Sequence, residues 1–310
     1  MRGGGCGAGF AVTKRMREPL DPLDCVFCLV YGRLQFLAGD RERQARMLAK
    51  AAELVARWPS RTTVFVESYD YLEKLVGVKD LYRDRKNALN KAALEALGAL
   101  DIDSMSTSEL LSLMAAANGV DIPMPGYTPG IEKLLRGLRD RPVWLGISEH
   151  DIDRLLEAAE RIVVVLDNAG EAVFDIAAAW QLATKYGKPL YMVVRSEPYE
   201  VDVTRDEAVG LAAKIAPRAW IIGTGGRYPV FHPRAAKEAR RLLGHGSLIL
   251  VKGIANLEAF LDYPETAAEA YTIFLLRAKC KPLARLFDVG HADPVIASST
   301  WLLKKVRGRR

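Results

Sequence analysis

Amide side chains are scarce in this sequence of 310 residues, which has only three glutamines and five asparagines. Loss of these thermolabile residues, together with many arginines and glutamates, is typical of proteins from thermophiles, so we expect a thermophilic source. The asparagines that remain are candidates for positions where another side chain would not serve. They are Asn87, Asn90, Asn118, Asn168 and Asn256.

Long hydrophobic runs are also missing. No apolar run reaches the roughly 18 residues that a membrane span needs, and the longest ones, such as 162–166 and 248–251, have the length of strands. The first 20 residues are rich in glycine and contain no continuous apolar segment of the kind found in signal peptides. We therefore expect a cytoplasmic protein with no membrane partner, which begins with a flexible leader at residues 1–20.

Cysteine is sparse, with four residues in all, and Cys25 and Cys28 form a single C-x-x-C pair. A structural zinc site needs four ligands, and the sequence has neither a second pair nor a nearby histidine. A thioredoxin-like role would need a strand before the pair, whereas the segment that follows it looks helical. The two cysteines are interpreted as packing thiols or as one local disulfide.

Positive charge is in excess, with a formal net charge of +6, and part of it lies in a basic tail at residues 304–310. This balance fits a small anionic ligand or a nucleic acid, although a tail of this kind can simply be solvated. The sequence has no zinc-finger spacing and no aromatic-rich RNA-binding signature. We therefore expect a small anionic partner and no nucleic acid.

Two halves of the chain differ in their periodicity. Residues 21–142 look helical, with an amphipathic stretch at 41–58 and a capping-box pattern that opens a helix at 106–117. Residues 143–303 alternate helical segments with β-branched or apolar runs, as in a parallel sheet covered by helices. No G-x-G-x-x-G follows the first run, which argues against a dinucleotide site. The predicted strands are 161–166, 189–194, 219–222, 248–251 and 273–276.

Polar residues and glycines follow each predicted strand. Ligands bind at the carboxyl ends of the strands in open parallel sheets, so these residues are expected to share one rim. Oxygen ligands from Asp and Asn suit a hard divalent cation, while lysines and glycine-turn amides suit phosphate. In chain order the residues are Asp167, Asn168, Glu171, Asp202, Gly225, Lys252, Gly253, Asn256, Glu258 and Lys279.

Each of these residues has a simpler interpretation when it is taken alone. Asp167 and Asp202 could each cap a helix, and the glycines at 223–226 could form an ordinary turn. Lys252 is harder to explain in this way, because it ends an apolar run and a lysine in such a place needs a partner. Independent caps need not assemble a metal ligand set beside an anion pocket, so the combination favours a functional site.

Several motifs resemble those of the damage-control phosphatase family, long known as domain-of-unknown-function family 89, in its short archaeal-type branch. The resemblance covers about residues 25–285. It rests on Cys25-x-x-Cys28, Asp80-Leu-Tyr-x-x-x-Lys86-x-x-x-Asn90, Asn118-Gly-Val-Asp121, Leu166-Asp-Asn-Ala-Gly-Glu171-Ala-Val-Phe-Asp175, Val201-Asp-Val-Thr-Arg-Asp206, Lys252-Gly-Ile-Ala-Asn256-Leu-Glu258 and Arg277-Ala-Lys279-Cys-Lys-Pro282. Leu81 and Ala117 depart from the family pattern, which usually has proline and glycine there.

The resemblance implies a fold and a set of roles. The fold is an α/β class, with a three-layer α/β/α domain and a mainly parallel sheet, preceded by an all-α helical N-terminal domain. One divalent ion (Mn²⁺, Mg²⁺, Co²⁺ or Ni²⁺) would be held by Asp167, Asn168 and Asp202. The substrate pocket would include Glu171, Lys252, Asn256 and Glu258, with Asn90 and Asn118 reaching over from the helical domain. Substrates of the family are sugar phosphates or damaged phosphometabolites.

The expected reaction is metal-dependent hydrolysis of a phosphomonoester of a small metabolite. Asp167, Glu171 and Lys252 are the predicted catalytic residues; Lys252 would neutralise charge on the phosphoryl group, helped by amides at Gly225 and Gly253. Water is favoured as nucleophile over a carboxylate, because Ala169 stands where the second aspartate of a D-x-D motif would be. A carboxyl methyltransferase and a non-catalytic phosphometabolite-binding module are the alternatives. The sequence does not indicate an oligomeric state.

Overall fold

A computed structural model of the chain describes residues 22–119 and 131–308. The predicted leader at 1–20, Asp121 of one motif and the last two residues of the basic tail lie outside the described residues. No helix among the described residues is both long and apolar enough to cross a membrane.

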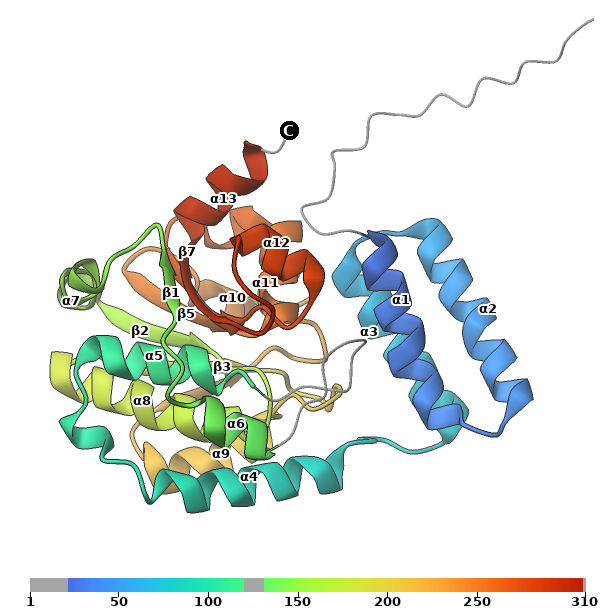
Figure 1. Cartoon of the computed structure of the whole chain (residues 1–310), viewed down its shortest axis with the longest axis horizontal. Coiled ribbons are helices and arrows are strands. Elements are labelled where there is room, and N and C mark those ends of the chain that lie inside the picture. The colour runs from blue at the N-terminus through green and yellow to red at the C-terminus, as the bar shows by residue number, and fades with distance from the viewer. Residues whose placement is uncertain (1–21, 120–130, 309–310) are drawn as a thin grey trace, which may run out of the picture.

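A seven-stranded sheet forms the centre of the described structure, with the order β1-β7-β6-β5-β2-β3-β4 (Figure 1). All neighbouring strands are parallel except β6 and β7, which are antiparallel. The strands are β1 (Val143–Leu145), β2 (Arg161–Val165), β3 (Leu190–Val194), β4 (Trp220–Gly223), β5 (Ser247–Lys252), β6 (Tyr271–Arg277) and β7 (Pro294–Ser298).

Helices cover both faces of the sheet, because successive side chains of each central strand point to opposite faces and both faces are apolar. Leu248 and Leu250 of β5 pack with the first helical layer, whereas Ile249 and Val251 pack with the second. The first layer contains α4 (Arg83–Leu97), α5 (Thr107–Ala117), α6 (Ile131–Gly137), α7 (Glu149–Ala158), α8 (Glu171–Tyr186) and α9 (Arg205–Ile215). The second contains α10 (Lys237–Arg241), α11 (Ile254–Asp262), α12 (Lys281–Phe287) and α13 (Ser299–Arg307).

The first three helices form a separate apolar cluster beside the sheet, at the right of Figure 1. These helices are α1 (Pro22–Leu34), α2 (Arg41–Arg57) and α3 (Arg61–Val76). Tyr199 and Val201, from the segment that follows β3, complete this cluster and join it to the α/β part. Short 3₁₀ turns occur at η1 (Gln35–Leu37), η2 (Ile102–Ser104) and η3 (Pro264–Ala267).

The structure confirms the predicted class, an α/β fold with a mostly parallel sheet between helical layers, preceded by helices. It also confirms the capping box of α5, in which Ser106 and Glu109 each accept the other's backbone N–H. Helices α4 to α6 pack into the first layer on the sheet, although they belong to the segment assigned to the helical half. The boundaries of the predicted domains stay a prediction.

Two strands were not predicted. Strand β1 has only three residues and lies at an exposed edge, so it lacks a long apolar run. Strand β7 begins with a proline and ends with small residues, a composition that does not favour a strand. Strand β7 and its parallel neighbour β1 run opposite to the other five strands.

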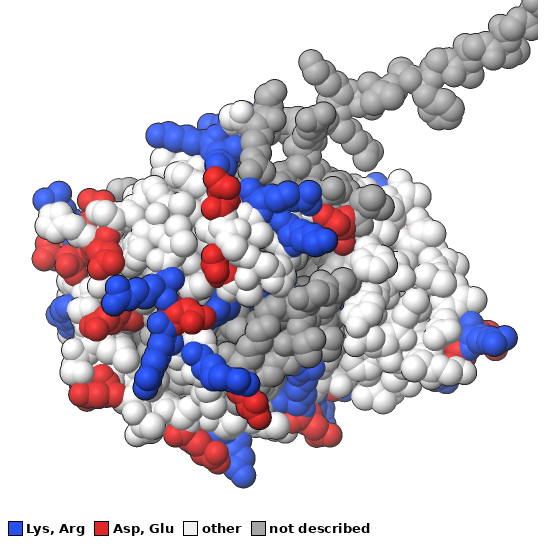
Figure 2. All heavy atoms as spheres, in the orientation of Figure 1, with Lys and Arg blue, Asp and Glu red and all other residues white. Residues whose placement is uncertain are grey.

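Charged side chains of both signs are interspersed over the α/β part of the face shown in Figure 2, while the part formed by α1 to α3 is mainly uncharged there. The net charge of +6 is therefore not gathered into one basic surface on this face.

Candidate active site

The predicted metal ligands lie in two loops that are joined by backbone hydrogen bonds. Asp167 and Asn168 follow β2, and Asp202 lies in the loop after its parallel neighbour β3. Asn168 and Asp202 form an isolated antiparallel bridge. The backbone N–H of Val203 donates to Asp167 O at 2.8 Å, and that of Ala169 donates to Val201 O at 2.8 Å. These bonds hold the three polar residues next to one another.

Asp167 is packed tightly from two sides. The side-chain amide nitrogen of Asn168 donates to Asp167 Oδ2 at 2.8 Å, and that of Asn118 approaches the same oxygen at 3.4 Å. Gly253 has a φ of +78°, and a Cβ on it would stand 2.0 Å from Asp167 Cγ. A glycine is therefore required here both by the left-handed backbone and by the space that the Asp167 carboxylate takes.

Glu171 lies behind Asp167 and is completely buried. Its carboxylate accepts two hydrogen bonds from Asn118 Nδ2, at 3.0 and 2.8 Å. Burial raises the pKa of Glu171, and the nearby Lys252 and Lys279 oppose that shift. Since Asn118 also reaches Asp167, Glu171 orients a side chain that in turn contacts the predicted metal ligand.

Lys252 is completely buried and does not line the cavity described below. Its Nζ lies 3.1 Å from Asp175 Oδ1 on α8, and it donates a hydrogen bond to the carbonyl oxygen of Met114. Burial raises the pKa of Asp175 to about 8, against the opposing effect of Lys252. The predicted phosphate-binding role of Lys252 stays a prediction; in the described structure its ammonium is held by α5 and α8.

The predicted substrate-binding asparagines are bonded to the backbone. Asn90 Oδ1 accepts the N–H of Gly170 at 2.7 Å, which links α4 to the loop after β2. Asn256 Nδ2 donates to the carbonyl oxygens of Leu166 at 3.2 Å and Lys252 at 2.8 Å, which ties together the ends of β2 and β5. Both residues shape the strand ends in this structure.

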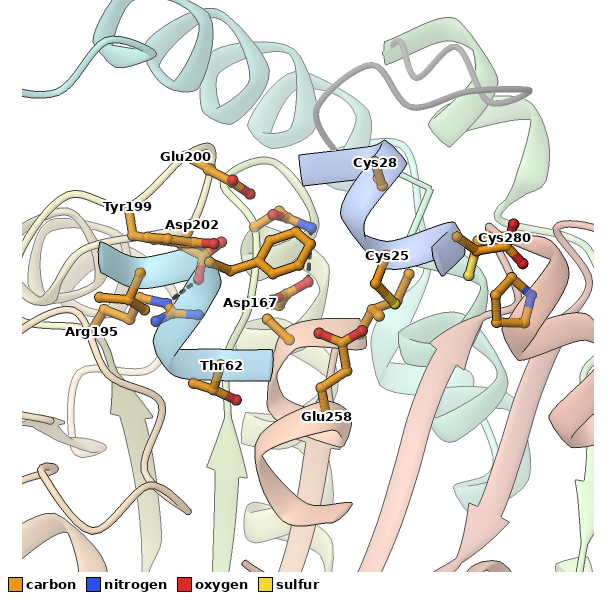
Figure 3. A pocket seen from close by; sticks show the side chains of 17 residues that line it. Cys25, Cys28, Thr62, Asp167, Arg195, Tyr199, Glu200, Asp202, Glu258 and Cys280 are labelled. Atoms are coloured by element: carbon orange, nitrogen blue, oxygen red, sulfur yellow. Dashed lines mark hydrogen bonds and ion pairs between the residues drawn. The ribbon is translucent and has the colours of Figure 1, made fainter. Parts of the chain in front are cut away.

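The remaining predicted binding residues differ in their position relative to the Asp167 carboxylate. Gly225 is exposed, and its N–H donates to Ser196 Oγ at 2.8 Å. Lys279 is completely buried, whereas Glu258 faces the same space as Asp167 (Figure 3). The structure therefore brings together Asp167, Asn168, Asp202 and Glu258, and it places the other predicted residues behind the rim or beside it.

A cavity of about 120 Å³ lies between the rim and the first three helices. Figure 3 shows Cys25 and Cys28 on α1 and Thr62 on α3 around it, with Arg195, Tyr199, Glu200 and Asp202 on one side and Cys280 on the other. The lining residues are Asp24, Cys25, Cys28, Thr62, Phe65, Val66, Asp167, Asn168, Arg195, Tyr199, Glu200, Asp202, Ile254, Ala255, Glu258, Cys280 and Pro282.

Arg195 was missed as a site residue, although it directly follows β3 and its position at a strand end was a usable signal. Its Nε donates to Asp202 Oδ2, and its Nη1 donates to the carbonyl oxygen of Arg227. The guanidinium carbon lies 4.2 Å from the centre of the Tyr199 ring. Burial alone would lower the pKa of Arg195, but Asp202 and the other nearby acids raise it, so the group stays charged.

The three cysteines of the cavity are free thiols, so Cys25 and Cys28 form no local disulfide. Burial, with a smaller effect from Glu258, raises the pKa of Cys25 to about 12. This thiol is therefore protonated at neutral pH and behaves as a packing group. The part played by α1 in the wall could not be predicted from the C-x-x-C pair alone.

Comparison with known proteins agrees with the motifs. The sequence model of the damage-control phosphatase ARMT1-like domain matches residues 22–295. The chain belongs to this family. A protein of Archaeoglobus fulgidus named damage-control phosphatase is 27% identical over 290 residues, which cover 90% of this chain and 97% of the relative. An uncharacterised protein of Methanocaldococcus jannaschii is 27% identical over 288 residues, which cover 88% and 93%.

The fold of this damage-control phosphatase family member is also that of a solved structure. The crystal structure of a DUF89 family protein from Pyrococcus horikoshii has a TM-score of 0.70 to it, with coverage of 88% of this chain and 96% of that chain. At 21% identity this likeness shows the fold alone. The family inferred from the motifs is thus confirmed.

The donor set of this family member suits a hard divalent cation. Asp167, Asn168 and Asp202 line the cavity and would supply only oxygen donors to an ion, which favour Mg²⁺ or Mn²⁺ over softer ions. Across residues 22–119 and 131–308 no group of three or more His, Cys, Asp or Glu side chains could hold a metal ion. A metal site at this position would therefore depend on the carboxylates of Asp167 and Asp202 together with the amide of Asn168.

Proposed function

We propose that this protein is a divalent-metal-dependent phosphatase that hydrolyses phosphomonoesters of small metabolites, such as sugar phosphates or damaged phosphometabolites. The observation that carries the proposal is the convergence of Asp167, Asn168 and Asp202 on one cavity. Membership of the damage-control phosphatase family supports it, as does the name of the Archaeoglobus fulgidus relative. The cavity of about 120 Å³ is smaller than sites for drug-sized ligands, which suits a small substrate.

Asp167, Asn168 and Asp202 would hold the ion. A divalent ion bound there would polarise a phosphoryl oxygen and lower the pKa of bound water. Asn118 and Asn168 keep the Asp167 carboxylate in one orientation through their amide nitrogens. Glu171 keeps Asn118 in place from behind. Preorganisation of this kind reduces the rearrangement needed when charge develops on the substrate.

Water is the proposed nucleophile. Ala169 stands two residues after Asp167 and is completely buried, so no second carboxylate occupies the place that an aspartyl-phosphate route would use. Phe65, Val66 and Ile254 supply apolar surface to the cavity wall. That surface limits access of bulk water, which strengthens electrostatic contacts inside the cavity.

The test is hydrolysis of p-nitrophenyl phosphate by protein stripped with EDTA, with Mn²⁺, Mg²⁺, Co²⁺ or Ni²⁺ added back singly at elevated temperature. Metal content after equilibrium dialysis is measured in parallel. We expect Asp167→Ala and Asp202→Ala to lose bound metal and activity together. Asp206→Ala is the matched control, because the Asp206 side chain is 96% exposed and lies outside the cavity lining.

The outcomes separate the alternatives. Activity of Asp202→Ala with a normal metal content would show that Asp202 is not a ligand. Phosphate binding without turnover with any of the four ions would indicate a phosphometabolite-binding module. Binding of S-adenosylmethionine by metal-free protein would favour a carboxyl methyltransferase.

A further inference from the structure

The cavity wall is rich in carboxylates and poor in cations. Three of its five acids are paired with arginines from outside the cavity lining. Arg33 Nη1 lies 2.5 Å from Glu200 Oε1, Arg61 Nε lies 3.8 Å from Glu258 Oε1 and Arg285 Nη2 lies 2.9 Å from Asp24 Oδ2. A phosphomonoester carries up to two negative charges, so a cavity with this lining needs a cation that faces the ligand. The five acids are Asp24, Asp167, Glu200, Asp202 and Glu258.

Arg195 is the one lysine or arginine in the part of the cavity lining that the described residues form. Lys252, the cation expected from its motif, is instead enclosed by Asp175 and the Met114 carbonyl and does not reach the cavity. The side chain of Arg195 is only 6% exposed. A charge this deeply buried is retained only where it has partners, in the protein or in a ligand.

The partners of Arg195 leave one end of its guanidinium for a ligand. Its Nε is bonded to Asp202 and its Nη1 to the Arg227 carbonyl, while Nη2 has no hydrogen-bond partner within residues 22–119 and 131–308. The Tyr199 ring, 4.2 Å away, supports the guanidinium plane. Figure 3 shows Arg195 beside Asp202 on the cavity wall, across from Cys25.

We propose that Arg195 binds the phosphoryl group of the substrate and holds it at the end of the cavity where the Asp167 and Asp202 carboxylates lie. This proposal rests on the proposed phosphatase function for its catalytic part, but the phosphate-binding part stands without turnover. A guanidinium is planar and presents several N–H donors in a fixed geometry that matches phosphate oxygens. Because three contacts already hold it, Arg195 loses little freedom when a phosphate binds.

The contact with Asp202 gives Arg195 a second effect. One side chain then touches both a predicted metal ligand and the phosphoryl group, so the ion and the substrate are brought to a common geometry by Arg195. Loss of Arg195 should therefore weaken phosphate binding and slow the chemical step. Lys252, which was predicted to neutralise the phosphoryl charge, would instead act indirectly, through its contact with Asp175 on α8 behind the rim.

The experiment uses the full-length metal-loaded protein and inorganic phosphate as the probe. Arg195→Gln removes the charge, and Arg195→Lys keeps it without the planar set of donors. Isothermal titration measures the Kd for phosphate, and kcat and KM are measured with p-nitrophenyl phosphate. Arg205→Gln is the matched control, because Arg205 is 52% exposed on α9 and lies outside the cavity lining.

We expect Arg195→Gln to raise the Kd for phosphate at least tenfold and to lower kcat/KM by roughly 100-fold, the scale of losing one donor to a developing oxyanion. Arg195→Lys should fall between this variant and the unaltered protein. Added guanidinium ion should restore part of the kcat of Arg195→Gln. A residue with a merely structural role would show no such rescue.

The overturning results are equally specific. A folded Arg195→Gln protein with an unchanged Kd for phosphate would refute the assignment. If that variant does not fold, Arg195→Lys decides, and an unchanged Kd there would refute it too. If the unaltered protein hydrolyses no phosphomonoester with any ion, the proposed function fails, while the phosphate titrations still test Arg195.

Discussion

Lys252 and Asp175 face each other across 3.1 Å, and neither side chain is exposed to solvent. Asp175 lies on α8 and Lys252 ends β5, so the pair joins the first helical layer to the centre of the sheet. Glu171, one turn before Asp175, brings a second carboxylate close to the same ammonium. The pair therefore supports the elements from which the cavity rim extends.

Lys252→Met should be destabilising, because it leaves the Asp175 carboxyl buried without its cation. Burial keeps the Asp175 carboxyl largely neutral at pH 7, so we expect the loss in the free energy of unfolding that follows removal of a buried hydrogen-bond partner, about 1–3 kcal/mol. Urea denaturation at pH 7 measures it. Lys214→Met is the control, since Lys214 is exposed on α9, and its effect should stay within about 0.5 kcal/mol. Equal stability of the two variants would contradict the structural role given to Lys252.

Gly253→Ala should damage the metal site as well as the fold. The new Cβ would meet Asp167 Cγ at 2.0 Å, so the carboxylate has to move. Gly187→Ala is the comparison, because Gly187 also has a positive φ, +63°, but has nothing within 4 Å of its Cβ position. Its ψ is 35°, whereas that of Gly253 is 162°, so the backbone strain of the two variants differs and Mn²⁺ binding is the measurement that isolates the contact with Asp167. Backbone strain alone should cost Gly187→Ala about 1–2 kcal/mol.

Denaturation and Mn²⁺ titration distinguish the two glycine variants. Gly253→Ala should lose more stability than Gly187→Ala and should bind Mn²⁺ at least tenfold more weakly, while the Mn²⁺ affinity of Gly187→Ala stays normal. Normal Mn²⁺ binding by Gly253→Ala would show that Asp167 is not held in its place by this close contact.

His232 should make stability depend on pH in the acid range. The ring lies between Tyr228 and Tyr263, and its Nδ1 accepts the N–H of Arg234 at 3.1 Å, which favours the neutral form. Burial, with smaller effects from Arg234 and Arg240, lowers its pKa to about 4. In the unfolded chain the His232 ring becomes protonated near pH 6.5, whereas in the folded chain it stays neutral down to about pH 4. Stability is therefore full above pH 6.5 and falls as pH decreases towards 4.

Urea denaturation between pH 4.5 and 7.5 tests this dependence. His232 lowers the free energy of unfolding by at most about 1.4 kcal/mol per pH unit, which is the value for the uptake of one proton. His232→Gln should be less stable at pH 7 but should have a flatter profile. His245→Gln should keep the steeper profile, because His245 is exposed. Identical slopes for both variants would exclude His232 as the source.

Cys25 should resist alkylation in the folded protein. With a pKa of about 12, roughly one thiol in ten thousand is ionised at pH 8, and the thiolate is the reactive form. Cys28, one turn away and partly exposed, is the internal comparison. Mass spectrometry after limited iodoacetamide treatment should find Cys28 modified before Cys25. Faster modification of Cys25 would mean that this thiol is neither as buried nor as protonated as the structure indicates.

The rule that ligands gather at strand ends accounts for what the sequence could predict of the site. Asp167 and Asp202 follow neighbouring parallel strands, and the structure brings them to one cavity. The same rule places Arg195 at the end of β3, but the sequence offered no reason to prefer it over Lys252. The fold class was predictable from a different feature: the central strands are apolar on both faces, as expected for a parallel sheet between two helical layers.

The alternation of side chains along a strand explains the different placement of the two cations. Lys252 continues the face of Leu248 and Leu250, which points to α8, and there it meets Asp175. Arg195 follows Val194 and continues the face of Val193, which points to the second layer. Which face carries the cavity depends on the packing of α1 and α3, and that long-range contact has no local signature in the sequence.

Arg33 and Glu200, bonded to each other at 2.5 Å, are 167 residues apart in the chain, and Asp24 and Arg285, paired at 2.9 Å, are 261 apart. The cavity is thus walled by both the earliest and some of the latest described segments. During synthesis, which proceeds from the N-terminus, α1 and α3 emerge from the ribosome long before the strand ends that they cover. The nascent protein consequently has no complete cavity wall until Pro282 has been translated.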